Sequence, residues 1–267
     1  MILARNNVRD TGEVERRPLV FVHGFGCDQS MWRDVVQSFT PDFRIVTYDL
    51  TGMGGSDLSE YEPRRYAKLD AHAEDLLDIC AHLDLKDAII VGHSIGATIA
   101  VLAANMAPER MKRLILVSPS PSFLEDPATG YNGGYSREDL DGLVKFLDEN
   151  HLGWSHQMAP TIVGQDPDAP AAIELTQSFC RTDPRIARHF GHVTFFADRR
   201  ADFERLERPA LIIHCNQDAL VPMDVAWWMR DHIPESKLEI LQATGHCPHM
   251  TVPTDAVSAM RNFLEAA

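Results

Sequence analysis

The sequence predicts an α/β protein with a doubly wound, mostly parallel sheet. A four-helix insertion is expected to cover the carboxyl ends of its strands. Short β-branched or apolar runs alternate with helical segments along most of the 267 residues, a pattern typical of a parallel sheet covered on both faces. The alternation stops between about residues 119 and 202, where four helical patterns follow one another without a strand. No repeat or Pro/Gly-rich linker divides the chain. We therefore expect residues 1–267 to form one domain with a cap insertion.

Six apolar runs are expected to form the strands of this sheet. Each is rich in Val, Ile or Leu and is continuous in apolar character, as strands buried on both faces are. They are Pro18–Gly24, Phe43–Leu50, Ala88–Gly92, Arg113–Ser118, Ala210–Cys215 and Leu238–Leu241. The first dozen residues are expected to add a hairpin at one edge of the sheet.

Helical patterns lie between or after these runs. In Leu69–Leu83 the apolar residues recur at steps of three and four, which places them on one face of a helix. Further core helices are expected at Ser30–Phe39, Ser94–Asn105, Val225–His232 and Thr254–Glu265. Helices of the insertion are expected at Arg137–Asn150, Trp154–Val163, Pro170–Arg181 and Pro184–Phe196. Because open α/β sheets bind ligands at the carboxyl ends of their strands, the insertion is expected to cover the pocket.

Composition and charge argue against several classes of protein. The chain has 25 Lys+Arg and 39 Asp+Glu, a net charge of −14, which disfavours nucleic acid or an anionic membrane as the main partner. Five cysteines without a CxxC spacing indicate reduced thiols and a cytoplasmic setting, and residues 1–7 do not resemble a secretory signal. Residues 88–107 carry no charged side chain. The motif Gly92–Gly96 inside that stretch nevertheless indicates a strand, a turn and a helix rather than a membrane span.

That motif, G-x-S-x-G, is the first indication of chemistry. Between a strand and a helix it is typical of a nucleophile elbow, a sharp turn that exposes the hydroxyl of Ser94. A chance pentapeptide is the alternative interpretation, and the strand–turn–helix setting argues against it. The N-terminus of the following helix adds backbone N–H groups near a developing oxyanion. A hydroxyl nucleophile favours an acyl intermediate, and therefore ester, thioester or lactone chemistry.

Asp218 and His246 are the candidate partners of Ser94. Hydrolases with this elbow carry the acid and then the histidine after the serine in the chain, and each candidate follows one of the last two predicted strands. His246 would accept the serine proton, while Asp218 would hold the imidazole tautomer and stabilise the imidazolium. Asp224 as the acid and His249 as the base remain open as alternatives.

The stretch His23–Gly26 ends the first parallel strand and supplies a second feature of such a site. In hydrolases this loop donates one hydrogen bond to the oxyanion, and the residue after the nucleophile donates the other. The backbone N–H groups of Phe25 and Ile95 are therefore the expected donors. An ordinary glycine turn is the alternative interpretation of this stretch.

No cofactor and no metal are expected. Gly52–Asp57 follows a strand, but Asp57 stands where a dinucleotide-binding motif needs its last glycine. The chain has no P-loop motif and no H-E-x-x-H, and His246–His249 does not have a known zinc spacing. Cys247 is open to two interpretations, a redox-sensitive thiol or, more commonly, a small packed residue.

Together these motifs resemble the α/β-hydrolase fold family, and within it the RsbQ-type bacterial stress regulators, which are similar to the plant karrikin and strigolactone receptors. The resemblance covers nearly the whole chain. It implies a four-helix cap over a closed, mostly apolar pocket for a small hydrophobic acyl or lactone-like ligand. It rests on residues 23–29 with Trp32, 92–96, 118–121, 131–135 and 245–250.

By position, the resemblance implies a pocket lined mainly by aromatic side chains. Aromatic and Met walls suit a small hydrophobic ligand, although each of these side chains could equally be ordinary core. Because Met158 stands where the plant receptors usually have an aromatic residue, their ligand does not follow from the resemblance. The expected lining residues are Phe25, Phe123, Tyr135, Trp154, Met158 and Phe196.

The resemblance also implies a partner. RsbQ-type hydrolases positively regulate a PAS-containing phosphatase that controls the sigma-B general stress response. A signalling hydrolase with such a PAS-domain phosphatase as partner is therefore one hypothesis. A metabolic carboxylesterase without a signalling role is the alternative, and a cofactor-free oxidase or haloperoxidase that uses the same three residues is a third, because this fold carries many chemistries.

Overall fold

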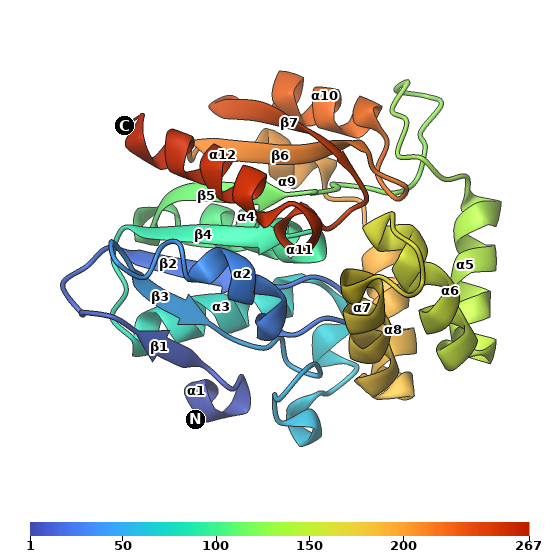
Figure 1. The fold of residues 1–267 in the computed structure, drawn as a ribbon, viewed down its shortest axis with the longest axis horizontal. Coiled ribbons are helices and arrows are strands. Elements are labelled where there is room, and N and C mark those ends of the chain that lie inside the picture. Colours follow the sequence, from blue (N-terminus) through green and yellow to red (C-terminus); the bar gives the residue numbers. More distant parts are fainter. Residues whose placement is uncertain (267) are drawn as a thin grey trace.

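Seven strands form one sheet at the centre of the molecule (Figure 1). The computed structural model describes residues 1–266. The sheet order is β1-β3-β2-β4-β5-β6-β7, and all neighbouring strands are parallel except β1 and β3. This confirms the predicted doubly wound, mostly parallel sheet. The strands are β1 (Arg9–Thr11), β2 (Pro18–Val22), β3 (Arg44–Thr47), β4 (Ala88–His93), β5 (Met111–Val117), β6 (Ala210–Gln217) and β7 (Ser236–Thr244).

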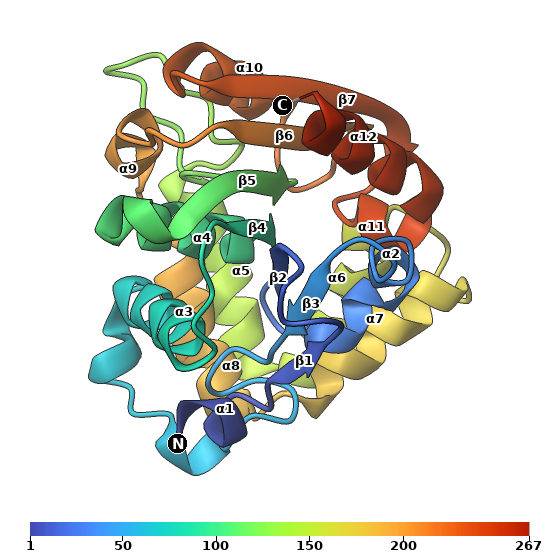
Figure 2. The same cartoon turned by 90° about the vertical axis from the view of Figure 1, so that its left-hand side faces the viewer.

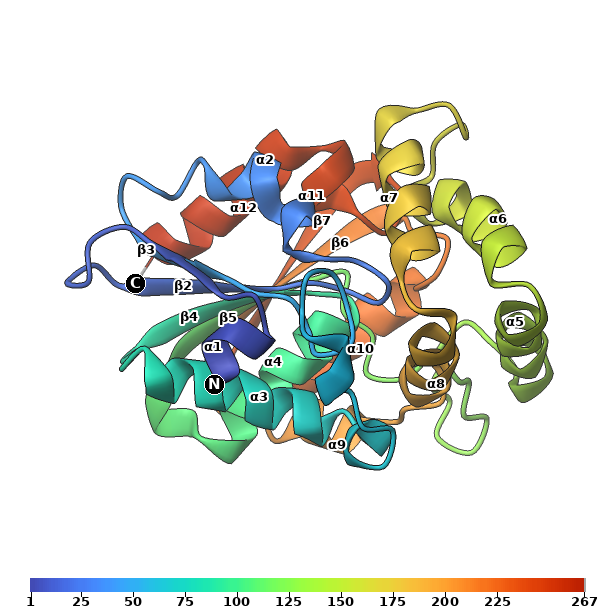
Figure 3. The same ribbon diagram turned by 90° about the horizontal axis from the view of Figure 1, so that it is seen from below.

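Helices cover both faces of the sheet (Figures 2 and 3). Every residue of β2 and β4 is buried, which explains why these strands are continuous apolar runs. One face carries α3 (Asp70–His82), α4 (Ile95–Met106), α9 (Arg200–Glu204) and α10 (Met223–His232), and the other carries α2 (Arg33–Val36), α11 (Pro248–Thr251) and α12 (Pro253–Glu265). Short 3-10 turns lie at η1 (Gln29–Trp32), η2 (Leu58–Glu60), η3 (Arg65–Ala67) and η4 (Pro108–Arg110).

The N-terminal segment differs from the hairpin that the sequence predicted. It forms a short helix, α1 (Ile2–Arg5), followed by the single strand β1, which pairs antiparallel with β3. The side chain of the buried Asn6 donates hydrogen bonds to the backbone oxygen of Asp49 at 2.9 Å and to Oγ1 of Thr51 at 3.0 Å. These long-range bonds hold the turn before β1 on the loop after β3. The expectation of a hairpin was therefore wrong.

Four consecutive helices lie between β5 and β6, at the positions that the sequence predicted. They are α5 (Arg137–Glu149), α6 (His151–Val163), α7 (Pro170–Arg181) and α8 (Pro184–Phe195). They lie together at the right of Figure 1, beyond the ends of the central strands. Ser136 and Asp139 form a reciprocal capping box at the start of α5. Within residues 1–266, none of the helices combines the length with the apolar character of a membrane span.

The order of the strands fixes where a site can form. Strand β2 lies between β3 and β4, so the chain adds strands first on one side of β2 and then on the other. Val22, the last residue of β2, pairs with Gly92 near the end of β4. The loop after β2 and the turn after β4 therefore lie side by side. Switch points of this kind are where open α/β sheets bind ligands.

A buried histidine lies between the core and the four-helix insertion. His72 in α3 packs between the rings of Tyr66, at a centroid distance of 4.6 Å, and Phe190 of α8, at 5.0 Å. Neither ring nitrogen of His72 has a hydrogen-bond partner within residues 1–266. Burial lowers the pKa of His72 from 6.5 to about 4, because the charged imidazolium is poorly solvated there.

Replacing this histidine with leucine is expected to reduce the pH dependence of stability. The folded protein resists protonation of His72, whereas the unfolded chain accepts it. Above about pH 6.5 His72 is neutral in both states and does not lower the free energy of unfolding. As the pH falls from 6.5 toward 4, the unfolded chain binds a proton that the folded protein does not, so the free energy of unfolding decreases. Over that range the free energy of unfolding should fall by about 3 kcal/mol more in the wild type than in His72→Leu, as measured by urea denaturation. The control is His82→Leu, at the exposed end of the same helix, which should behave like the wild type. An equal loss in the wild type and His72→Leu would contradict this account.

Candidate active site

Ser94 lies in a strained turn between β4 and α4. Its φ of 53° and ψ of −122° are values that side chains other than glycine rarely adopt. A Cβ atom on Gly92 would lie 2.5 Å from the backbone oxygen of Gly96, and one on Gly96 would lie 2.5 Å from that of Val22. Only glycine at both positions allows strand and helix to approach so closely. The sequence motif thus folds as the predicted elbow.

The side chains of Ser94, His246 and Asp218 meet at this turn. Nε2 of His246 lies 2.9 Å from Oγ of Ser94, and Nδ1 of His246 lies 2.7 Å from Oδ2 of Asp218. The side chains of His246 and Asp218 are 2% and 0% exposed. Asp218 follows β6 and His246 follows β7, so strand ends far apart in the sequence bring the three residues together. The structure therefore assembles the arrangement that a serine nucleophile needs.

The environment of Asp218 sets the orientation of the histidine. Burial alone would raise the pKa of Asp218, but the charge and hydrogen bond of His246, with a further contribution from His214, hold this pKa below its ordinary value. The second carboxylate oxygen, Oδ1, accepts the backbone N–H groups of Leu220 at 2.8 Å and Val221 at 3.1 Å. An ionised Asp218 accepts the Nδ1 proton of His246 and leaves Nε2 free to accept a proton from the serine.

The two rival residues lie outside this arrangement. Asp224 is exposed and accepts a hydrogen bond from Asn132 at 2.8 Å. His249 is buried between the rings of Trp32, at a centroid distance of 4.5 Å, and His93, at 4.4 Å. Neither ring nitrogen of His249 has a hydrogen-bond partner within residues 1–266. Neither Asp224 nor His249 is placed to act on Ser94.

His93 supports the site in a way that sequence reasoning missed. Its ring hydrogen-bonds through Nε2 to the backbone oxygen of His246 at 3.0 Å, and a Cβ atom on Gly24 would lie 2.6 Å from its Nδ1. The ring therefore fills the space between the loop after β2 and the loop that carries His246. Burial and the neighbouring histidines hold the pKa of His93 well below its ordinary value, so the ring is neutral. The only indication of this role in the sequence was that His93 directly precedes Ser94.

The end of helix α6 is attached to the His246 loop. The backbone N–H of His246 donates to the backbone oxygen of Ile162 at 2.6 Å. A side chain on Gly245, whose φ is +98°, would overlap the backbone oxygen of Val163. The insertion therefore touches the loop of the proposed base directly.

Helix α7 is attached to the loop after β2 in a similar way. Oγ of Ser178 donates to the backbone oxygen of Gly26 at 2.8 Å, and a side chain on Gly26 would overlap the ring of Phe179. Arg181 forms an ion pair with Asp28 at 3.3 Å. This helix thus holds the loop that carries Phe25.

Phe25 and Ile95 carry the backbone N–H groups that the sequence analysis expects to act as oxyanion donors. Ile95 is the first residue of α4, and Phe25 borders the same cavity as Ser94. Within residues 1–266 neither N–H group donates to an acceptor. We therefore keep these two groups as the proposed oxyanion donors.

A narrow cavity of about 30 Å³ adjoins Ser94. Three of the expected lining residues, Phe25, Phe123 and Trp154, border it. Most of the wall is apolar, so the cavity suits a hydrophobic group. The other lining residues are Cys27, His93, Ser94, Ile162, Leu175, Phe179, Thr194, Phe195, Leu220, His246 and Cys247.

Three expected lining residues, Tyr135, Met158 and Phe196, do not border the cavity. The hydroxyl of Tyr135 donates to a backbone oxygen in the loop after β6, and Met158 is half-buried against the hydrophobic core. Phe196 follows the end of α8 and lies under the guanidinium of Arg137 at 4.5 Å, while its neighbour Phe195 lines the cavity. Successive side chains of a helix point about 100° apart. A lining residue inferred from resemblance is therefore wrong when the inferred position is shifted by one residue, as Phe196 is from Phe195.

Cys247 is a buried wall residue of the cavity. Burial, with smaller contributions from neighbouring groups, raises the pKa of its thiol well above the ordinary value. The thiol is therefore protonated, whereas oxidation requires the thiolate. Of the two interpretations, the structure favours a small packed residue.

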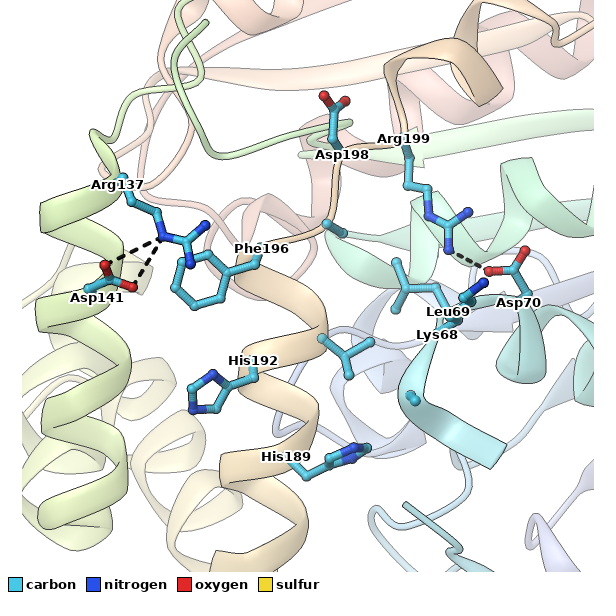
Figure 4. A pocket seen from close by; sticks show the side chains of 13 residues that line it. Lys68, Leu69, Asp70, Arg137, Asp141, His189, His192, Phe196, Asp198 and Arg199 are labelled. Carbon is cyan, nitrogen blue, oxygen red and sulfur yellow. Dashed lines mark hydrogen bonds and ion pairs between the residues drawn. The ribbon is translucent and has the colours of Figure 1, made fainter. Parts of the chain in front are cut away.

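A larger hollow lies outside this site. An open cleft of about 760 Å³ separates the start of α3 from α5 and α8 (Figure 4). Its charged side chains include two ion pairs, Arg199 with Asp70 and Arg137 with Asp141. Ser94 does not border this cleft. The candidate site is therefore the small cavity beneath the insertion.

Comparisons with known proteins agree with this geometry. Residues 17–253 match the family model described as alpha/beta hydrolase fold. The chain is 34% identical to the strigolactone esterase of Pisum sativum over 95% of this chain and 94% of the relative. It is 33% identical to the karrikin insensitive 2 receptor IA of Petunia hybrida, over 89% of this chain and 86% of the relative. A hydrolase from Oleispira antarctica superposes with a TM-score of 0.95 at 36% identity, over 100% of this chain and 97% of that structure. The chain therefore belongs to the alpha/beta hydrolase fold family, as a serine ester hydrolase.

Proposed function

We propose that this enzyme cleaves small hydrophobic esters or lactones through an acyl intermediate on Ser94, and that it acts as a signalling hydrolase. The observation that carries the catalytic part is the continuous hydrogen-bonded chain from Ser94 through His246 to Asp218 beside an apolar cavity. A nucleophile, a base and an orienting acid within hydrogen-bond distance are the parts that acyl transfer requires.

The first half of the reaction forms the acyl-enzyme. Oγ of Ser94 attacks the carbonyl carbon of the substrate while Nε2 of His246 takes the hydroxyl proton. Asp218 stabilises the imidazolium, and the N–H groups of Phe25 and Ile95 donate to the oxyanion. When the intermediate collapses, the bond to the leaving alcohol breaks and His246 gives that alcohol its proton.

The second half restores the serine. A water molecule gives a proton to His246 and attacks the acyl carbon, and the bond from that carbon to Oγ of Ser94 breaks. His246 then returns the proton to the serine. An ester yields an acid and an alcohol, whereas a lactone yields a single hydroxy acid.

The signalling part of the proposal rests on similarity. Relatives of this chain include a protein named as a receptor and one named as a strigolactone esterase, and its motifs resemble those of RsbQ-type regulators. We therefore propose a PAS-containing phosphatase as the partner and the cytoplasm as the location. A purified phosphatase of this kind should gain activity when the hydrolase and its ligand are added. No gain with the wild-type hydrolase would contradict the signalling role.

A metabolic carboxylesterase is the second candidate. The observation that favours it is the small cavity at Ser94, which suits a simple ester better than a ligand with several rings. Fast turnover of many short esters, together with no effect on the phosphatase, would support this candidate over the first.

Removing the serine hydroxyl is expected to abolish ester turnover. Ser94→Ala should lower kcat for p-nitrophenyl acetate by about 10⁶-fold. Asp218→Asn should lower kcat by about 10⁴-fold because the histidine loses its orienting carboxylate. Initial rates give both values. Asp224→Asn, at the exposed rival acid, is the matched control and should keep the wild-type rate. A wild-type rate in Ser94→Ala would overturn the assignment of the nucleophile.

A serine-directed sulfonyl fluoride is expected to label the protein once. Only a serine beside a base forms the sulfonyl adduct quickly, so intact mass should increase by one adduct and peptide mapping should place it on Ser94. Ser120→Ala removes a buried serine after β5 and should still be labelled, whereas Ser94→Ala should not. An adduct mapped to any other residue would contradict the site.

A further inference from the structure

We propose that the cavity accepts acyl groups of about acetyl size and that Leu175 of α7 limits their length. This inference rests on the proposed function and names the substrate class of the same site. Its starting point is the volume of about 30 Å³ beside Ser94, which is far below the roughly 300–1,000 Å³ of ordinary ligand pockets. A cavity this small favours a short acyl chain on Oγ over a long one.

The walls of the cavity resist expansion because they are packed rings. The ring of Phe25 lies between 5.7 and 6.1 Å, centroid to centroid, from those of Trp154, Phe179, Phe190 and Phe195. All four of these neighbours are buried. Moving one ring requires moving the others, so inserting methylenes into such packing is unfavourable.

The same cluster is joined to the oxyanion loop. Phe25 contributes its ring to the cluster and its backbone N–H to the proposed oxyanion site. Ser178 donates a hydrogen bond to the backbone oxygen of Gly26, the residue after Phe25, and Phe179 packs against Gly26. A long acyl chain that displaced Phe179 would therefore disturb the oxyanion donor as well. Discrimination against long chains should appear in kcat and not only in KM.

Leu175 is the wall residue best placed to set the limit independently. It lies one helical turn before Phe179 on α7 and borders the cavity, but its aliphatic side chain is not part of the ring cluster. Shortening it lengthens the space while the rings stay in place. Leu140 on α5 offers a matched control, because it is 0% exposed against 2% for Leu175 and does not border the cavity.

The test measures kcat/KM for p-nitrophenyl acetate, butyrate and octanoate. The wild type should prefer acetate to butyrate by about 10-fold or more and should act still more slowly on octanoate. Leu175→Ala should raise the ratio of butyrate to acetate about 10-fold, and Leu140→Ala should leave that ratio unchanged. Thermal unfolding checks that each variant is folded, and Leu175→Val, which removes a single methylene, replaces the alanine variant if that variant unfolds.

The outcomes separate this inference from the proposed function. Ser94-dependent turnover that is fastest on butyrate or octanoate would overturn the size limit alone. An equal change of ratio in Leu175→Ala and Leu140→Ala would overturn the role of Leu175. Absence of Ser94-dependent turnover at every chain length would overturn the proposed function and the inference with it.

Discussion

The close approach of β4 and α4 at Ser94 is the constraint on which the rest of the site depends. Two glycines without side chains allow the strand to turn at once into the helix, and the serine at the turn accepts a left-handed backbone conformation. That turn aims Oγ into the space above the sheet, where the loops after β2, β6 and β7 also end. Local strain is thus maintained by packing on all sides, as is common at catalytic centres.

The four-helix insertion is structurally part of this site as well as its cover. Helix α6 is bonded to the loop that carries His246, and α7 is bonded to the loop that carries Phe25. Both helices also line the cavity. The position of the base, the position of an oxyanion donor and the shape of the pocket are therefore consequences of the same contacts.

The sequence predicted the sheet and the meeting of three side chains because both follow from local patterns. Apolar runs identify buried strands, and the residues after parallel strands must gather at one edge. The expected N-terminal hairpin was wrong because Asn6 bonds to residues more than forty positions away. The expected lining failed at Met158 in α6 and at Phe196 after α8, since the direction of a side chain depends on how a helix and its end are rotated against their neighbours. It also failed at Tyr135, which lies in the loop before α5. No local pattern could have revealed the bond from His93 to the loop of His246.

The contact between Gly245 and Val163 has a consequence for engineering. The backbone oxygen of Val163 occupies the space that a side chain at position 245 would need, and the adjacent N–H of His246 bonds to Ile162. Exchanging the insertion for that of another enzyme in order to change specificity would also move the backbone oxygen that accepts from His246 unless the end of α6 keeps its position. A functional chimaera must therefore keep the backbone of residues 162–164 in place against residues 245–246.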